Sequence, residues 1–367
     1  MADVGFGHEG RETARLGRMV EVSGNESPAG GESRESSRVL VVIVNYRTAD
    51  LVVDCLGSLV GERAALSGMR VVVTDNASGD GSVERIGQAI KARGWSEWAR
   101  VEALERNGGF SYGNNAAIGP ALGGEGAPEF VWLLNPDTVV RGGAGAALVR
   151  FMLEHESVGI VGSRLEYPDG REQGSARRMI RPVSELLSGA RLGWLSRLLG
   201  RYEVALPAGE STYECDWVSG ASMMVRREVF EGIGLLDEGY FLYFDEVDFC
   251  LRAKRAGWGV WFEPASRVVH LEGAATGFKA ERRRRGRWWY ESRRRFFVKA
   301  YGVMGLIAAD VLWAIGRLSL AVRRLLRLGG DMSGDPAWFA WDLLAGDARA
   351  LLTGRLPRRP GRRGEGR

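Results

Sequence analysis

The stretch Val39-Leu40-Val41-Val42-Ile43-Val44, followed directly by Asn45-Tyr46, is where an ordered pattern begins in this chain. A continuous run of apolar, mostly β-branched residues is typical of a β-strand that is buried on both faces. Residues 1–38 are rich in glycine, serine, glutamate and arginine, and we expect a disordered tail there. This tail contains a literal GxGxxG at residues 5–10, but no strand precedes it and no helical pattern follows, so it does not predict a nucleotide site.

Similar apolar runs follow at residues 71–74, 130–134 and 158–162, and helical patterns over 49–59 and 82–92 lie between the first three strands. Strands that alternate with helices of about a dozen residues indicate βαβ units, so we expect an α/β protein with a mostly parallel sheet. In such sheets ligands bind beyond the carboxyl ends of the strands. Those ends carry polar residues in this chain, namely Asn45-Tyr46, Asp75-Asn76 and Asn135-Pro136-Asp137.

The composition is that of an ordinary globular protein. Of the 367 residues, 45% are hydrophobic and 26% are charged, which excludes a fibrous or wholly disordered chain. The three cysteines, Cys55, Cys215 and Cys250, have the spacing of neither a zinc site nor a disulfide framework, so a reducing, cytoplasmic compartment is expected. The first residues do not predict a signal peptide, because they contain no apolar run.

Two polar loops carry residue types that suit a nucleotide. Asp75 ends the second strand, where its carboxylate could accept an N–H from a pyrimidine base; the same loop would also serve to begin the next helix, with Asp80 or Ser82 as N-cap. Residues 107–115 contain three glycines and three asparagines. Glycine lets the backbone approach a ligand, and a helix that begins here would direct N–H groups at an anion, although a plain turn would look similar.

The segment Asn135-Pro136-Asp137 offers an amide oxygen and a carboxylate two residues apart, so both would face the same side of an extended chain. Oxygen ligands suit a hard cation, and Mg²⁺ often takes only one or two carboxylates plus substrate phosphates. A simple Pro-Asp turn is the alternative. His270 ends another apolar run and is a candidate ligand for the same cation, although a lone histidine is usually structural.

Residues 241–252 form the sharpest local feature of the sequence. Asp245, Glu246 and Asp248 place three acids within four positions, directly after four bulky apolar residues. Like-charge repulsion and an apolar setting both raise the pKa of a carboxyl group, which suits one of the three to remove a proton. The alternative is a solvated helix start, where acids are favourably placed for the helix dipole.

Together these segments resemble the family 2 glycosyltransferases of the GT-A fold, and within them the bacterial rhamnosyltransferase-like branch. The resemblance covers about residues 39–275, and five motifs occur in the family's order. They are Val41 to Tyr46, Asp75-Asn76-Ala77-Ser78, Asn107-Gly108-Gly109-Phe110 with Gly113-Asn114-Asn115, Leu134-Asn135-Pro136-Asp137, and Trp217-Val218-Ser219-Gly220-Ala221 with Phe241 to Arg252.

The resemblance implies a nucleotide-sugar donor, dTDP-L-rhamnose or alternatively a UDP-sugar, whose base binds near Asp75. It also implies Mg²⁺ or Mn²⁺ at Asp137, with His270 as a possible further ligand. The family's first metal-motif acid is Asn135 here, which leaves Asp137 as the one carboxylate of that motif and puts metal dependence in question. The donor-side residues expected from the resemblance are Asn45, Tyr46, Asp75, Asn107, Gly108, Gly109, Asn114 and Asn135.

On the acceptor side, the resemblance implies that Asp245 is the general base of an inverting transfer. The first acid of the Asp245-Glu246 pair carries this role in the family motif, and Glu246 and Asp248 would support it, with Asp248 orienting Arg252. Trp217 and Gly220 belong to the same expected acceptor region. The acceptor expected from the family is a lipid-linked or growing cell-envelope glycan.

The positive charge is concentrated at the carboxyl end: residues 39–280 carry a net charge of −6 and residues 281–367 carry +12. Nine positive residues between 282 and 299 are interleaved with Trp288, Trp289 and Tyr290, which suits nucleic acid or an anionic membrane surface. The apolar run over 302–316 is too short to span a bilayer and contains Asp310, so an in-plane amphipathic helix, a helical hairpin, or a helix packed on the catalytic domain is expected.

The sequence therefore predicts a tail over 1–38, a GT-A domain over 39–275, a basic and amphipathic segment over 276–330, and a short helix with an arginine-rich tail over 331–367. The expected protein is a cytoplasmic glycosyltransferase, peripheral at the inner membrane face, with no nucleic-acid partner. Two rivals from other classes are a nucleic-acid-binding protein carried by the arginines and a catalytically inactive GT-A scaffold.

Overall fold

The computed structural model describes residues 38–124, 126–206, 209–271, 273, 284–328 and 336–357. The expected tail over 1–38 lies outside these residues except for Arg38, and so do the GxGxxG match, Arg282 and Arg283. The expected arginine-rich end over 358–367 lies outside them as well.

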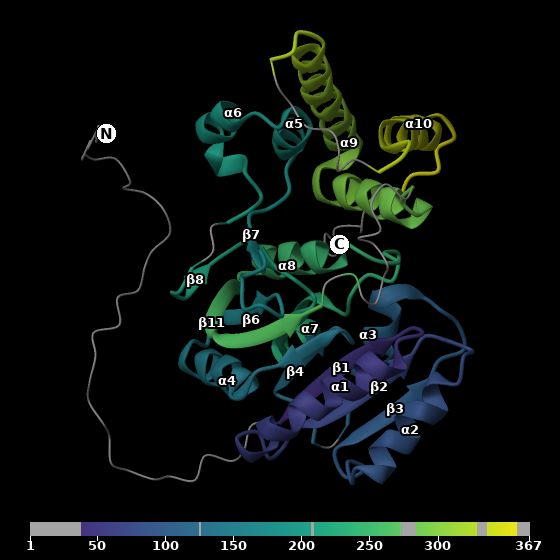
Figure 1. Cartoon of the computed structure of the whole chain (residues 1–367), viewed down its shortest axis with the longest axis vertical. Coiled ribbons are helices and arrows are strands. Elements are labelled where there is room, and N and C mark those ends of the chain that lie inside the picture. The colour runs from purple at the N-terminus through teal and green to yellow at the C-terminus, as the bar shows by residue number, and fades with distance from the viewer. Residues whose placement is uncertain are drawn as a thin grey trace, which may run out of the picture.

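A twisted mixed sheet forms the centre of the molecule (Figure 1). Its strands lie in the order β3-β2-β1-β4-β10-β6-β11-β5, and β8 pairs with β11. The short strands β7 and β9 form a separate two-stranded sheet. The strands are β1 Val39–Asn45, β2 Arg70–Asp75, β3 Ala99–Ala103, β4 Phe130–Leu134, β5 Thr138–Val140, β6 Val158–Glu166, β7 Ala176–Arg177, β8 Tyr213–Glu214, β9 Trp217–Val218, β10 Ser222–Arg226 and β11 Gly259–His270.

The strands predicted from apolar runs are confirmed. All residues of β1 and β4 are buried, as expected of strands covered on both faces. β1, β2, β3 and β4 are parallel to one another, and the register pairs Asn45 with Asp75. Beyond β4 the sheet becomes mixed, because β10 runs antiparallel between β4 and β6, and β5 runs antiparallel to β11.

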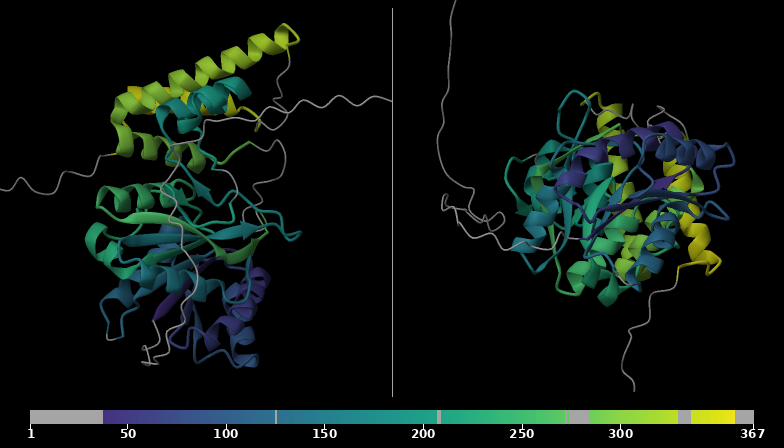
Figure 2. Two further views of the ribbon diagram at one scale, coloured as in Figure 1. Left: turned by 90° about the vertical axis from the view of Figure 1, so that its left-hand side faces the viewer. Right: turned by 90° about the horizontal axis from the view of Figure 1, so that it is seen from below.

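Helices cover both faces of this sheet (Figures 1 and 2). α1, α2 and α4 share one hydrophobic core with Val41 and Ile43 of β1, and α3, α7, α8 and α9 share the other with Leu40 and Val42. The helices are α1 Ala49–Leu59, η1 Val60–Ala64, α2 Ser82–Ala92, α3 Gly109–Leu122, α4 Ala144–Glu154, α5 Pro182–Ala190, α6 Gly193–Leu198, η2 Gly200–Tyr202, α7 Arg227–Ile233, α8 Asp245–Arg255, α9 Arg287–Leu325 and α10 Phe339–Leu352.

The carboxyl-terminal helices α9 and α10, together with α5 and α6 from the middle of the chain, form a helical layer at one end of the molecule (Figure 2). α9 is a hairpin rather than one straight helix, because Gly302 interrupts it with φ 77° and ψ −179°. That backbone conformation is accessible essentially only to glycine. The hairpin brings Asp310 of the second half against Arg293 of the first half, with 2.8 Å between the carboxylate Oδ1 and the guanidinium Nη1.

The basic segment is paired within the protein, which corrects the interpretation of 282–299 as an open cationic patch. Arg293 is 1% exposed, and its guanidinium contacts Glu185, Asp310 and Asp347. Five other cations of this segment also pair with carboxylates: Arg284 with Asp342, Arg287 with Glu291, Arg294 with Asp347, Arg295 with Asp237, and Lys299 with Asp237 and Asp248. Arg285 lies over the rings of Trp289 and Phe339.

Among the described residues, α9 is the one helix that is long and apolar enough to cross a membrane, and a third of its apolar window is buried in the protein. α5 packs closely on its second half, since a methyl group added at Gly316 would lie 2.6 Å from the Leu186 carbonyl oxygen. Of the expected alternatives for 302–316, the structure shows a helical segment packed on a neighbouring helix, and the turn of the hairpin lies at Gly302, where this segment begins.

Candidate active site

The carboxyl ends of β1 and β2 are joined by a compact hydrogen-bonded knot around Asp75. Asn45 Nδ2 donates to Asp75 Oδ1 at 2.6 Å, and Ser78 donates to the same carboxylate through its hydroxyl (2.6 Å) and its backbone N–H (2.9 Å). Asp75 is only 2% exposed. Most of its acceptor capacity is used inside the loop, so Asp75 shapes the donor-side loop and leaves Oδ2 with room for one further donor.

Tyr46 and Arg47 lie beside this knot. The Tyr46 ring is 40% exposed, and the Arg47 guanidinium lies 5.1 Å from its centroid. Arg47 adopts a positive φ of 59°, and Ser78 fixes it by accepting its backbone N–H at 2.9 Å. The sequence analysis missed Arg47, although its position two residues after the first strand end could have indicated a cation at the ligand-binding edge.

The glycine-asparagine segment begins α3 and holds two parts of the chain together. Gly109 has φ 86°, and a methyl group added there would lie 2.0 Å from the Phe241 carbonyl oxygen. That oxygen accepts the Phe110 N–H at 2.8 Å, while Asn107 Oδ1 accepts the Gly109 N–H at 3.1 Å. Gly109 is thus required for a close backbone contact between this segment and the chain that leads to Asp245.

The other residues of this segment serve the packing of α3. The Gly109 N–H already donates to Asn107 Oδ1. Asn114 Nδ2 donates to the Phe110 carbonyl, one helical turn back, at 2.9 Å. The Oδ1 atom of Asn114 is buried and has no hydrogen-bond partner among the described residues. Gly108 precedes α3 directly, at its N-cap.

Asn135, Asp137 and His270 meet where β4 and β11 end and β5 begins. His270 Nε2 lies 3.5 Å from both Asn135 Nδ2 and Asp137 Oδ1. His270 Nδ1 lies 3.0 Å from Gln173 Oε1, which can only accept, so Nδ1 carries the proton and Nε2 presents a lone pair toward Asp137. A histidine oriented through its other nitrogen in this way is typical of metal ligands.

This arrangement fits a divalent cation with two protein ligands. Within the described ranges, no group of three His, Cys, Asp or Glu side chains could hold a metal ion. Asp137 and His270 therefore suit a cation whose remaining ligands come from a diphosphate and water, as is usual for Mg²⁺. Gln173, which the sequence analysis did not identify, orients His270 from an irregular stretch after β6.

Asp245 is the first residue of α8 and is 3% exposed. The turn before it is strained, since Tyr243 and Phe244 both have positive φ values (65° and 66°). Ser111 of α3 donates to Asp245 Oδ2 at 3.3 Å. The strained turn before Asp245 and the hydrogen bond from Ser111 together fix the direction of the Asp245 carboxylate.

The carboxyl groups of Asp245 and Glu246 affect each other's pKa. Burial raises the pKa of Asp245, against a smaller opposing effect of hydrogen bonds from Glu246 and Ser111. Burial and the Asp245 charge raise the pKa of Glu246 well above its usual range. The pKa of Glu246 is thus raised further by its neighbour's charge, whereas the hydrogen bonds to Asp245 favour its ionised form, so Asp245 is the better proton acceptor of the two.

Trp217, Gly220 and Arg177 lie next to this pair. A methyl group added at Gly220 would lie 3.3 Å from the Phe110 ring and 3.7 Å from Glu246 Cβ. Trp217 is anchored by its Nε1–H on the Arg178 carbonyl, and the Arg177 guanidinium lies 5.5 Å from its ring. The Arg177 charge opposes the rise in the pKa of Glu246, so Arg177 is a cation on the acceptor side that the sequence analysis missed.

Asp248 and Arg252 have structural contacts. Asp248 accepts from Arg252 Nε at 3.0 Å and pairs with Lys299 of α9 at 2.8 Å. Arg252 also donates to the carbonyls of Ile233, the last residue of α7, and of Leu235, two residues beyond it. Their contacts attach α8 to α7 and α9, in keeping with the expectation that Asp248 orients Arg252.

Hydrogen bonds to backbone carbonyls bring these parts into one site. Asn76 Nδ2 donates to the Gly109 carbonyl at 3.0 Å, which joins the β2 end to α3. The Asn135 N–H donates to the Ala221 carbonyl at 3.0 Å, directly after Gly220. The donor-side loops, the Asp137–His270 pair and the Asp245–Glu246 pair are therefore held at one edge of the sheet.

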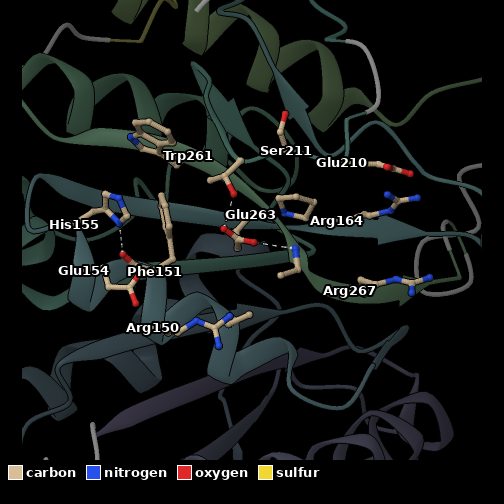
Figure 3. A pocket seen from close by; sticks show the side chains of 14 residues that line it. Arg150, Phe151, Glu154, His155, Arg164, Glu210, Ser211, Trp261, Glu263 and Arg267 are labelled. Atoms are coloured by element: carbon tan, nitrogen blue, oxygen red, sulfur yellow. Dashed lines mark hydrogen bonds between the residues drawn. The ribbon is translucent and has the colours of Figure 1, made fainter. Parts of the chain in front are cut away.

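A separate cavity of about 770 Å³ lies between α4 and β11 (Figure 3). Phe151, His155 and Trp261 line one side of it, and its acid Glu263 accepts hydrogen bonds from Thr212 (2.8 Å) and the Ala265 N–H (2.9 Å). None of the predicted site residues lines this cavity. We assign it no part in catalysis.

Residues 36–291 match the description of the glycosyltransferase-like family 2. The chain belongs to this family. It is 29% identical over 251 residues to the N-acetylglucosaminyl-diphospho-decaprenol L-rhamnosyltransferase of Mycobacterium tuberculosis, which covers 65% of this chain and 77% of that enzyme. It is also 29% identical over 220 residues to the low-salt glycan biosynthesis hexosyltransferase Agl10 of Haloferax volcanii, covering 59% of this chain and 61% of the relative.

The fold is that of the GT-A glycosyltransferases. A mannosyltransferase from Pyrobaculum calidifontis, solved in complex with GDP-mannose and Mn²⁺, superposes with a TM-score of 0.52 at 15% identity, over 86% of this chain and 81% of that one. The glycosyltransferase family and the GT-A fold predicted from the motifs are thus confirmed. The protein is a family 2 glycosyltransferase with rhamnosyltransferases among its relatives.

Proposed function

We propose that this family 2 glycosyltransferase transfers L-rhamnose from dTDP-L-rhamnose to a hydroxyl of a lipid-linked or cell-envelope glycan, with inversion at the anomeric carbon. The observation that carries the proposal is the buried Asp245–Glu246 pair at the start of α8, beside the strand ends of a GT-A sheet. The choice of rhamnose and of a lipid-linked acceptor rests on the printed name of the mycobacterial relative. A UDP-sugar is the alternative donor.

In the proposed mechanism Asp245 removes the proton from the acceptor hydroxyl as its oxygen attacks the anomeric carbon. A positioned base of this kind contributes a factor of about 10²–10⁴ to the rate. Glu246 keeps its own proton and, by donating to Asp245, maintains the base in its ionised form. The displacement is a single in-line step, so no residue forms a covalent bond to the sugar.

On the donor side, the knot of Asn45, Asp75 and Ser78 shapes the loop for the base, and Tyr46 and Arg47 offer a ring and a cation at its rim. Asn107, Gly108, Gly109, Asn114 and Asn135 hold the neighbouring segments in place. Asp137 and His270 would hold the cation, Mg²⁺ or Mn²⁺. When bound, such an ion acts as a Lewis acid that stabilises charge on the leaving diphosphate.

Trp217, Gly220 and Arg177 would contact the acceptor, because they lie next to the Asp245–Glu246 pair. Arg177 suits an acceptor that carries phosphate near the accepting sugar. A lipid-linked acceptor implies action at a membrane, and we place the enzyme in the cytoplasm, peripheral at the inner face.

The experiment that tests the proposal is a thermal-shift screen of nucleotide sugars with and without Mn²⁺, followed by transfer assays with each donor that binds. A ligand at 100 times its Kd stabilises the folded state by about 2.7 kcal/mol. We expect dTDP-L-rhamnose to give the largest shift, and the shift to fall in the Asp137→Asn variant. A larger shift with UDP-sugars would select the alternative donor, and no shift or turnover with any donor would favour an inactive scaffold.

A further inference from the structure

The second half of α9 exposes an apolar stripe on the side opposite its packed face. Met304 is 74% exposed, Leu318 65% and Leu325 83%, values that a packed helix gives only to polar residues. The full stripe, which follows helical spacing, is Met304, Val311, Ile315, Leu318, Val322 and Leu325. The opposite face of the same helix is buried, through Leu306, Ala309, Trp313, Gly316 and Leu320.

The helix is thus apolar on both of its faces. A surface helix normally pairs an apolar face with a polar one, whereas a helix that is apolar all round is covered on all sides. Here one side is covered by α5, and the other faces outward at the end of the molecule farthest from α1 and α2 (Figure 2). A partner for the outer face is therefore required.

Two neighbouring helices of the same end add exposed apolar and aromatic residues. α10 and the residue before it expose Trp338 (69%), Trp341 (67%) and Leu352 (89%), and α6 exposes Trp194 (59%) and Leu198 (73%). α6, α9 and α10 lie at one end of the molecule in both views (Figures 1 and 2). We call the exposed apolar residues of these three helices the apolar end face.

Arginines border the apolar end face. Arg324 and Arg327 follow the stripe at the end of α9, and Arg349 and Arg355 lie at the end of α10; all four are exposed. Tryptophan prefers the interface between lipid headgroups and acyl chains, and arginine is attracted to anionic headgroups. A second copy of this chain would instead bring these arginines against like charges.

We propose that the apolar end face inserts into the surface of an anionic lipid bilayer, with α9 lying in the membrane plane. This inference rests on the proposed function only in the choice of a bilayer, the site of a lipid-linked acceptor, as partner. The membrane-contacting region is then the apolar end face and not the arginine-rich 284–299 segment, whose cations are paired within the protein.

The packing of α9 favours an in-plane position over a spanning one. To cross the bilayer, the helix would have to separate Asp310 from the buried Arg293 and leave its close contact with α5 at Gly189 and Gly316. The first change would leave a charge unpaired in an apolar environment, which is costly, and the second would lose close helix packing. Insertion of the stripe alone disturbs neither contact.

The test is co-sedimentation of the full chain with vesicles of phosphatidylglycerol and phosphatidylethanolamine, compared with vesicles of phosphatidylcholine. We expect tighter binding to the anionic vesicles, weakened by salt, and a loss of at least about tenfold in partitioning for the Leu318→Glu/Leu325→Glu variant, because two buried leucine contacts are lost. The matched control is Val60→Glu/Leu153→Glu, which changes two apolar residues of 44% and 42% exposure in the catalytic domain. It should bind as the wild type does.

A second measurement reports insertion directly. Cys55, Cys215 and Cys250 are all buried, so a cysteine introduced by Leu318→Cys can be labelled selectively with an environment-sensitive fluorophore. Its emission should shift to the blue on addition of anionic vesicles, and the same label at Val60→Cys should not respond.

Three outcomes would overturn the proposal: no vesicle binding by the wild type, equal binding by the Leu318→Glu/Leu325→Glu variant, or a wild-type dimer that this variant converts to a monomer. An assay of sugar transfer to a water-soluble acceptor tests the proposed function separately from membrane binding. The double variant should keep that transfer, and if no protein transfers the sugar, the proposed function fails while the vesicle result still decides this inference.

Discussion

The molecule contains two pairs of buried carboxyl groups, one in each half, and the cost of burying their charge is offset differently in the two pairs. Asp245 and Glu246 begin α8 at the edge of the sheet, and Asp310 and Asp347 lie between α9 and α10. Burial raises the pKa of both members in each pair, that of Asp310 to about 6. A buried carboxylate is costly unless a cation or hydrogen bonds compensate it.

The two pairs differ in the arginine that lies near them. Arg293, which is 1% exposed, contacts Asp310 at 2.8 Å and Asp347 at 3.2 Å, and Glu185 at 3.0 Å. The cation near the Asp245–Glu246 pair is Arg177, which is partly exposed and acts on Glu246. A pair with a buried arginine holds helices together, whereas a pair without one keeps a carboxyl group of raised pKa that suits the proton acceptor we propose.

The largest expected effect comes from removing the proton acceptor. Asp245→Asn should lower the transfer rate by about 10²–10⁴ or more, since the amide cannot accept the hydroxyl proton. The thermal stability should be equal or higher, because a buried charge is removed, and nucleotide binding should persist. Transfer assays, calorimetric unfolding and thermal shift with the donor measure these three quantities.

The control for this variant is Asp54→Asn, which removes an exposed carboxylate of α1 and should leave the rate unchanged. Near-normal turnover of Asp245→Asn would show that another group is the base.

The second effect is on stability. Arg293→Met should lower the free energy of unfolding by about 3–5 kcal/mol at pH 7, because it leaves the buried Asp310 carboxylate without its cation and Asp347 with Arg294 alone. The loss should shrink as the pH falls from 7 to 5. Without Arg293 the folded-state pKa values of Asp310 and Asp347 rise further above their unfolded values, so proton uptake favours the folded state at lower pH.

Urea unfolding at several pH values measures this loss. Arg287→Met is the matched control, since Arg287 is exposed and pairs only with Glu291 across one helical turn; its effect should stay within about 0.5 kcal/mol. A loss for Arg293→Met that is small, or that grows as the pH falls, would contradict the assigned role.

The smallest expected effect is a shift in the pH dependence of transfer, which tests whether Glu246 acts on Asp245 through a hydrogen bond. Transfer should decline on the acid side as Asp245 takes up a proton, at a higher pH than for an ordinary aspartate, because burial raises the pKa of Asp245. Glu246→Gln keeps a hydrogen-bond donor and should leave this limb in place. Glu246→Leu removes the donor and should move the limb to higher pH by about one unit.

The pH dependence of kcat/KM for the two variants measures this shift. Equal profiles for Glu246→Gln and Glu246→Leu would mean that Glu246 does not tune the base, whatever its effect on the rate.

The first strands and the donor-side edge could be predicted because their signals are local. The apolar run of β1 and the parallel register that pairs Asn45 with Asp75 follow from strands of the expected length. The contact between Ser111 and Asp245 joins residues 134 positions apart, and no spacing rule predicts it. Gln173 and Arg177 come from a stretch without periodicity, where tertiary contacts alone fix the chain.

The same reason explains the incorrect interpretation of the basic segment. A cluster of cations is visible in the sequence, but the acids that neutralise Arg293, Arg294 and Arg295 lie between 17 and 108 residues away. The sequence shows the charges, and only the fold shows how they pair.

The kink at Gly302 has a consequence for topology. A straight helix of the 39 residues of α9 would be about 58 Å long, and Arg293 and Asp310 would be about 25 Å apart along its axis. Such a rod, with its apolar half unpaired, would have the length of a membrane anchor. One residue with a backbone conformation that other amino acids avoid therefore separates the in-plane position that we propose for α9 from one in which the helix could be threaded through a bilayer.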